Sequence, residues 1–199
     1  MLVTLATRTF TPEPTAAALR LGALARALAG GGDRVRVLTS RLAPAVARGA
    51  ARADEPGTGL VEVRRAPVLR DRTGAVRGYV SYLSFDVPLI ARLLAGPRPD
   101  VVVAEPPPTT GAAVRLACAL RRVPYVYYCA DIVSDAAALA GVARPVVRAV
   151  AGLESFALRG ARRVVAVSDG VAGRARDLGA ADVAVVPNGV RVPEAVAAG

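Results

Sequence analysis

Short runs rich in valine and leucine alternate along the chain with longer stretches rich in alanine and leucine. The short runs have the length and β-branched content of strands, and the longer stretches have the length of helices and end near glycine or proline. The predicted strands are 2–7, 34–39, 60–65, 100–104, 124–129, 163–167 and 183–186. The predicted helices are 15–29, 79–94, 109–121 and 144–159, with a short helix after Ser168 and a loop over 43–59.

This alternation predicts an α/β fold: a single doubly wound, Rossmann-like domain around a mostly parallel sheet. The 199 residues suit one such domain, which we place at 1–190, with 191–199 as the start of a linker. In sheets of this kind, ligands bind outside the carboxyl ends of the strands. The candidate binding loops are therefore 8–14, 105–110, 130–135 and 168–169.

Composition limits the kinds of metal site and catalytic mechanism that the chain can have. Hydrophobic residues make up 53% and charged residues 21%, which is typical of a folded domain. Histidine is absent, and Cys118 and Cys129 lack metal-ligand spacing, so histidine metal sites and Ser-His catalysis are excluded. The net charge is +10, and every positive side chain is arginine. The alternatives for this charge are a preference for anionic partners and a coding bias with solvated faces.

The expected location is the cytoplasm, because the N-terminus lacks a signal-peptide pattern and no apolar run reaches spanning length. Residues 64–77 carry five arginines: Arg64, Arg65, Arg70, Arg72 and Arg77. This stretch is either a solvated loop or a peripheral contact with an anionic membrane at its inner face. Nucleic acid is an unlikely partner, because no aromatic platform or reader motif accompanies the charge.

The first candidate loop follows the first strand and contains Thr11, Glu13 and Thr15 as predicted substrate contacts. A loop that opens a helix presents free backbone N–H groups to an anion. The glycine-rich signature of a phosphate cradle is absent here. The alternative is that Pro14 and Thr15 only begin the helix.

Acidic side chains follow two of the later predicted strands. Glu105, with Thr109, is placed to hydrogen-bond hydroxyl groups of a ligand, unless it only lies near the dipole of the next helix. Asp131 and Asp135 form a pair in which one carboxylate orients a hydroxyl or acts as a base. The alternative is that Asp131 or Ser134 caps a helix.

Two further polar residues complete the candidate substrate contacts. Ser168 is the predicted N-cap of the short helix, and Asn188 lies in the closing Pro-Asn-Gly turn.

Several short segments occur in order along nearly the whole chain. They are Pro12-Glu13-Pro14, 34–39, Arg98-Pro99-Asp100-Val101-Val102, Val123-Pro124-Tyr125-Val126, Asp131, Glu154, 161–168 and 185–190. In this order and spacing they resemble the family-four retaining glycosyltransferases, particularly the exopolysaccharide and lipopolysaccharide types. The sequence departs from that family at Thr15-Ala16, where a glycine is usual, at Arg191, where Asp is common, and in 131–135, which lacks the usual Trp and Pro.

The resemblance implies half of a GT-B fold, in which two Rossmann-like halves face a cleft. This chain corresponds to the N-terminal, acceptor-side half, with Asp131 as the catalytic candidate and Asp135 beside it. The co-substrate would be a nucleotide sugar, with no other cofactor and no metal. A donor-binding domain, in cis or in trans, would carry the family's E-x7-E pair. The expected reaction is retaining transfer of a hexose to a lipid-linked or small-molecule acceptor, with no activity in this half alone. The alternative is a non-catalytic Rossmann-like subunit that recruits a catalytic chain to the membrane.

Overall fold

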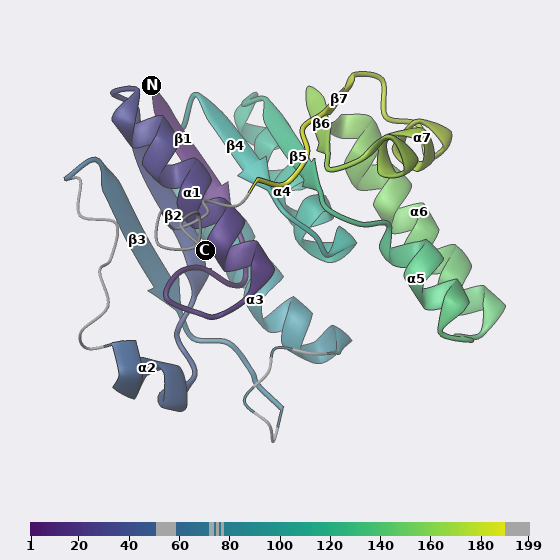
Figure 1. The fold of residues 1–199 in the computed structure, drawn as a ribbon, viewed down its shortest axis with the longest axis horizontal. Coiled ribbons are helices and arrows are strands. Elements are labelled where there is room, and N and C mark those ends of the chain that lie inside the picture. The colour runs from purple at the N-terminus through teal and green to yellow at the C-terminus, as the bar shows by residue number, and fades with distance from the viewer. Residues whose placement is uncertain (51–58, 72–73, 75, 77, 190–199) are drawn as a thin grey trace, which may run out of the picture.

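The computed structural model describes all residues except 51–58, 72–73, 75, 77 and 190–199. The seven strands of the described residues pair in parallel within one sheet, in the order β3-β2-β1-β4-β5-β6-β7 (Figure 1). The strands are β1 (Leu2–Ala6), β2 (Arg34–Ser40), β3 (Val61–Ala66), β4 (Val101–Ala104), β5 (Tyr125–Cys129), β6 (Arg163–Ala166) and β7 (Val183–Val185). The predicted doubly wound parallel sheet is confirmed.

Helices cover both faces of this sheet. They are α1 (Ala16–Gly30), α2 (Pro44–Ala50), α3 (Tyr79–Ala95), α4 (Pro108–Arg121), α5 (Val133–Leu139), α6 (Arg144–Gly160) and α7 (Asp169–Asp177). Helix α1 packs on one face of β1 and β2, whereas α3, α4 and α6 share a core with the opposite face of β4, β5 and β6 (Figure 1). The strands and long helices lie within one residue of their predicted bounds.

Two short helices differ from the sequence prediction. Helix α2 lies inside the predicted loop 43–59, where Pro44 begins a single alanine-rich stretch too short to show a helical period. Helix α5 begins at Val133, inside the predicted loop 130–135. Its N-terminus is satisfied by Glu154 of α6, a contact between segments about 20 residues apart that local sequence does not reveal. The predicted linker 191–199 lies outside the described residues.

Small side chains allow the helices to approach the sheet closely. Alanines, valines and leucines dominate both core clusters, as the low aromatic content predicts. Gly111 of α4 lies so close to β5 that a Cβ there would come within 2.5 Å of Cε2 of the fully buried Tyr127. Tyr125 of the same strand is also buried, and its hydroxyl donates to the Ala157 carbonyl of α6. The tyrosines of β5 that point toward α4 and α6 are therefore packing residues.

The strand order reverses between β1 and β4. From β1 the chain crosses to β2 through α1, and from β4 it crosses to β5 through α4 on the opposite face. The loops that follow these two strands therefore diverge and leave a crevice at their carboxyl ends, which is where ligands bind in open α/β sheets.

Candidate functional site

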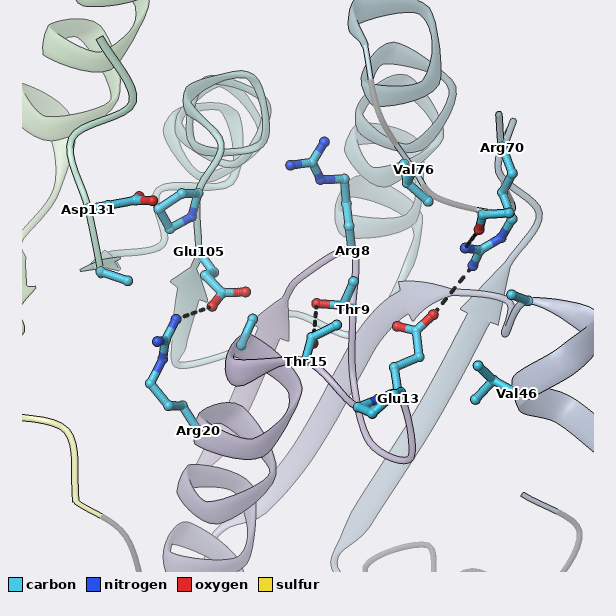
Figure 2. A pocket seen from close by; sticks show the side chains of 16 residues that line it. Arg8, Thr9, Glu13, Thr15, Arg20, Val46, Arg70, Val76, Glu105 and Asp131 are labelled. Carbon is cyan, nitrogen blue, oxygen red and sulfur yellow. Dashed lines mark hydrogen bonds and ion pairs between the residues drawn. The ribbon is translucent and has the colours of Figure 1, made fainter. Parts of the chain in front are cut away.

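A cavity of about 580 Å³ opens at the carboxyl ends of β1, β4 and β5 (Figure 2). Its walls come from residues 8–9, 13–15, 17 and 20 of the first loop and α1, from 43, 46, 70, 74 and 76, and from 105–106 and 130–131. Three of the four predicted binding loops therefore meet in one site. The fourth, at Ser168 and Asp169, does not line this cavity.

Two arginine–glutamate pairs stand on opposite sides of the cavity (Figure 2). Nη2 of Arg20 lies 3.4 Å from Oε1 of Glu105, and Nη2 of Arg70 lies 3.5 Å from Oε1 of Glu13. Burial raises the pKa of both glutamates, while the neighbouring arginine charges act in the opposite direction. Each pair presents hydrogen-bond donors beside acceptors, which is the arrangement that polyhydroxylated ligands require.

Glu105 follows β4 and is held in place by a residue at the end of the neighbouring strand β1. The residue is buried, and its Oε2 accepts a hydrogen bond of 2.9 Å from Oγ1 of Thr7 at the end of β1. The donor of this hydrogen bond thus follows β1, and its acceptor follows the adjacent strand β4. The prediction that Glu105 stands at the carboxyl end of a buried strand is confirmed in position.

Glu13 and Arg70 join the first loop to the segment that follows β3. Oε2 of Glu13 accepts from the Phe10 backbone at 3.3 Å. The Arg70 guanidinium also donates to the Gly74 carbonyl at 2.8 Å and to Oγ of Ser40 at 3.2 Å. Arg70 therefore forms part of the cavity wall. In the sequence it is only one member of a basic stretch.

Arg8 lies between the two pairs (Figure 2). Its guanidinium is stacked 3.8 Å from the centre of the Tyr82 ring. Burial lowers the pKa of Arg8, while Tyr82, Asp86 and Glu105 act in the opposite direction. Asp86 is buried on α3 and accepts a hydrogen bond of 2.6 Å from Oγ1 of Thr110. Burial also raises the pKa of Asp86. Neither Arg8 nor Asp86 was a predicted site residue, because nothing local distinguishes Arg8 from the other arginines or marks Asp86 as buried.

Four of the predicted site residues line the cavity: Glu13, Thr15, Glu105 and Asp131. Thr15 is also the N-cap of α1 and accepts from the Ala18 backbone at 3.1 Å, so the alternative that it begins the helix is confirmed, and its role as a substrate contact stays a prediction. Thr11 lies in the first loop but does not line the cavity, and its carbonyl accepts from Arg65 at 2.6 Å. Thr109 lies in the first turn of α4.

Asp131 is exposed at the cavity, and none of the described residues hydrogen-bonds to its carboxylate. The idea that Asp131 or Ser134 caps the following helix is wrong. The N-cap position of α5 is Ile132, and the first N–H groups are satisfied by the buried Glu154 carboxylate. The contacts are 2.8 Å from the Val133 nitrogen and 3.2 Å from the Ser134 nitrogen.

Three other candidates lie outside the cavity. Asp135 accepts two hydrogen bonds of 2.8 Å from Arg174 of α7. Ser168 caps α7, as predicted, by accepting from the Val171 backbone. Asn188 accepts a hydrogen bond of 3.1 Å from the Tyr128 hydroxyl. Their roles as substrate contacts stay predictions.

The described arginines of the predicted basic stretch, Arg64, Arg65 and Arg70, do not form one surface. Arg64 and Arg65 belong to β3, and Arg65 donates to the carbonyls of Ser40 and Thr11. Arg70 is engaged in the cavity wall, and Arg72 and Arg77 lie outside the described residues. No helix within the described ranges is long and apolar enough to cross a membrane. Among the same residues, no three acids or cysteines gather where they could hold a metal ion.

A sequence model of the glycosyl transferase 4-like domain matches residues 15–189. The chain belongs to this family. A search of curated proteins finds no significant match.

Solved structures of glycosyltransferases share the fold. HepE of Anabaena, in complex with UDP-glucose, has a TM-score of 0.61 at 18% identity, over 96% of this chain and 44% of that one. Sucrose-phosphate synthase of Thermosynechococcus elongatus has a TM-score of 0.66 at 14% identity, over 95% and 48%. UGT89C1 of Arabidopsis thaliana, complexed with UDP-L-rhamnose, has a TM-score of 0.63 at 11% identity, over 97% and 53%. The chain thus spans about half the length of these proteins and has the Rossmann-like fold of one half of a GT-B glycosyltransferase.

Proposed function

We propose that this chain is the acceptor-binding half of a glycosyltransferase that uses a nucleotide-sugar donor. The observation that carries the proposal is the cavity at the β1/β4 switch point, lined by two arginine–glutamate pairs and by Asp131, whose carboxylate has no partner among the described residues. Membership of the glycosyl transferase 4-like family supports sugar transfer as the reaction.

The acids of the cavity differ in what they can do. Glu13 and Glu105 are buried and already accept hydrogen bonds, so they shape the site and hold hydroxyl groups at its walls. Asp131 is exposed, and its carboxylate oxygens accept no hydrogen bond from the residues that the structure describes. A free carboxylate at the mouth of a binding cavity can orient an acceptor hydroxyl or take its proton as transfer proceeds. We therefore assign this role to Asp131.

The donor would be bound by a second domain, in cis or in trans, that closes the cleft over this cavity. The transfer would retain the configuration of a hexose, and the acceptor would be lipid-linked or a small molecule. The nucleotide sugar would be the co-substrate, with no metal. Half of a cleft cannot stabilise the charge that develops on the leaving diphosphate, so the isolated 199-residue chain should form no product.

The test compares the isolated chain with the chain joined to a donor-binding domain encoded beside it. Each is incubated with radiolabelled UDP-glucose and other common nucleotide sugars, together with a lipid extract of the source cells as acceptor. Transfer by the joined protein and none by the isolated chain is the expected result. Robust turnover by the isolated chain would refute the need for a donor half, and a joined protein without activity would favour the non-catalytic subunit.

In the joined protein, Asp131→Asn should lower kcat/KM by about 100-fold or more, because general base and positioning groups contribute effects of that size. The matched control is Asp177→Asn, an exposed acid of α7 whose side chain is 65% accessible. The melting temperature of both variants should stay close to that of the wild type. Unchanged activity of the Asp131 variant would remove this residue from the mechanism.

A further inference from the structure

The outward face of α3 is apolar throughout. Its exposed positions hold Val80, Leu83, Val87, Pro88, Ala91, Leu94 and Ala95. Val80, Leu83 and Val87 are 71%, 52% and 60% exposed. A helix on the surface of a soluble domain usually places charged and polar residues on its outer side. Here the spacing of three and four residues gives α3 a second apolar face, opposite the one that packs into the core.

The neighbouring helix extends this surface. Helix α4 packs against α3, and its exposed positions are Leu116, Ala119 and Leu120. From Val80 to Leu94 the α3 stripe runs for about 21 Å, given a rise of about 1.5 Å per helical residue. An exposed apolar stripe of this length is typical of a contact with a membrane or with another protein.

The charged side chains that α3 and α4 leave outside the core are arginines, and Asp71 and Asp100 are exposed in the segments that flank α3. The two helices together contain one acidic residue, Asp86, and it is buried. Arginines collect at the C-terminal end of α3: the Arg92 side chain donates to the Arg64 carbonyl, and Arg121 donates to the Leu93 and Gly96 carbonyls. Arg98 follows the helix and is exposed. An apolar stripe on helices whose outer charges are arginines is the composition of helices that lie in the interface of anionic bilayers.

We propose that the outward face of α3, continued by α4, docks on an anionic lipid bilayer. The leucines and valines would enter the boundary between headgroups and acyl chains, and the arginines would meet lipid phosphates. A second copy of the chain fits less well. A two-fold contact through the same patch would place its arginine rim near an identical rim, between chains that each carry a net charge of +10.

This docking would bring the cavity to the membrane. Tyr82, between Val80 and Leu83 in the sequence, carries the stacked Arg8 guanidinium, which lines the cavity. A bilayer against the first turns of α3 would therefore lie beside the site, where a lipid-linked acceptor would present its headgroup. Only this last step rests on the proposed function. Bilayer binding itself needs neither donor nor acceptor, so its test is independent of the transfer reaction.

The experiment is co-sedimentation of the chain with vesicles of phosphatidylcholine and phosphatidylglycerol in a ratio of roughly three to one, and with pure phosphatidylcholine vesicles. The stripe variant carries Val80→Ser, Leu83→Ser and Val87→Ser. The matched control carries Leu19→Ser and Leu139→Ser, which replace leucines that are 68% and 90% exposed on α1 and α5. Because all five side chains are exposed, both variants should keep the wild-type melting temperature.

Wild type and control should bind the anionic vesicles and release them as salt rises, because the headgroup attraction is screened. The partition coefficient of the stripe variant onto the anionic vesicles should be at least about tenfold lower than that of the wild type. Equal binding by the stripe variant, no binding by the wild type, or equal binding to neutral vesicles would overturn the proposal. So would a wild-type dimer in sedimentation equilibrium that the stripe variant abolishes without any vesicle binding, since the surface would then join two copies of the chain.

Discussion

Replacement of Glu154 should destabilise the fold more than replacement of any exposed acid. The Glu154 side chain is 1% exposed on α6. Its carboxylate accepts from the Val133 nitrogen at 2.8 Å, from the Ser134 nitrogen at 3.2 Å and from Oγ of Ser134 at 2.6 Å. A hydrogen bond to a charged group is worth about 1.5–3 kcal/mol, and a buried donor left unpaired costs a similar amount.

Glu154→Ala removes all three acceptor contacts at once. Because the contacts share one carboxylate, their energies do not add fully, and we expect a loss of about 3–5 kcal/mol of unfolding free energy. This is a large share of the stability of a domain, which is about 5–15 kcal/mol. Glu154→Gln keeps one acceptor oxygen and should cost about half as much.

Urea unfolding followed by far-UV circular dichroism measures these losses, and the slope m should stay constant. The control is Asp135→Asn, whose carboxylate pairs with Arg174 in an exposed position and should contribute less than about 1 kcal/mol. If Glu154→Ala costs no more than this control, the buried carboxylate does not hold the start of α5, and the reasoning fails.

Three further measurements test the packing and the charges of the site. Gly111→Ala places a Cβ 2.5 Å from Cε2 of Tyr127 and should lower the unfolding free energy measured in urea by about 1–3 kcal/mol. At Gly152 an added Cβ would meet no neighbouring atom within 4 Å, so Gly152→Ala should raise the unfolding free energy by up to about 1 kcal/mol. Burial raises the pKa of both cysteine thiols to about 12, so they should resist a thiol reagent at about pH 8 until urea unfolds the chain. Burial raises the pKa of Glu105 in the folded chain above its unfolded value of about 4.3. The protonated carboxyl therefore contributes its whole stabilisation below about pH 4.3, and this stabilisation is lost as pH rises through the pKa of the folded state. The unfolding free energy of Glu105→Gln relative to wild type should therefore increase from about pH 4 to 7, and a decrease would contradict the assigned shift.

The frame of the fold could be predicted because its signals are local. Consecutive valines before Glu105 mark a buried strand, and Gly30-Gly31-Gly32 marks the end of α1. Alternation then fixes the parallel sheet, and the sheet fixes which loops meet at its carboxyl edge. Glu13, Glu105 and Asp131 come from three separate segments of the chain, and their meeting in one cavity supports this rule.

The rest of the site depends on contacts between distant segments. Arg8 and Arg70 are two among many arginines, and only the folded chain shows that one stacks on Tyr82 and the other pairs with Glu13. Asp86 lies in a helix and gains its buried position only because α3 packs against α4. Burial of a charged side chain is decided by what covers it, and the covering residues lie elsewhere in the sequence.

The start of α5 separates two acids that the sequence presents as an equivalent pair. Asp131 precedes the helix and lies at the cavity without a partner among the described residues, whereas Asp135 lies in the first helical turn and is paired with Arg174. Four residues of separation would keep both acids on one side if the helix began at Asp131, but it begins at Val133 because Glu154 satisfies its first N–H groups. The buried carboxylate of α6 thus determines which acid faces the cavity. If Asp131 has the proposed role, a variant that loosens this cap should alter acceptor use in a transfer assay through the position of Asp131 alone.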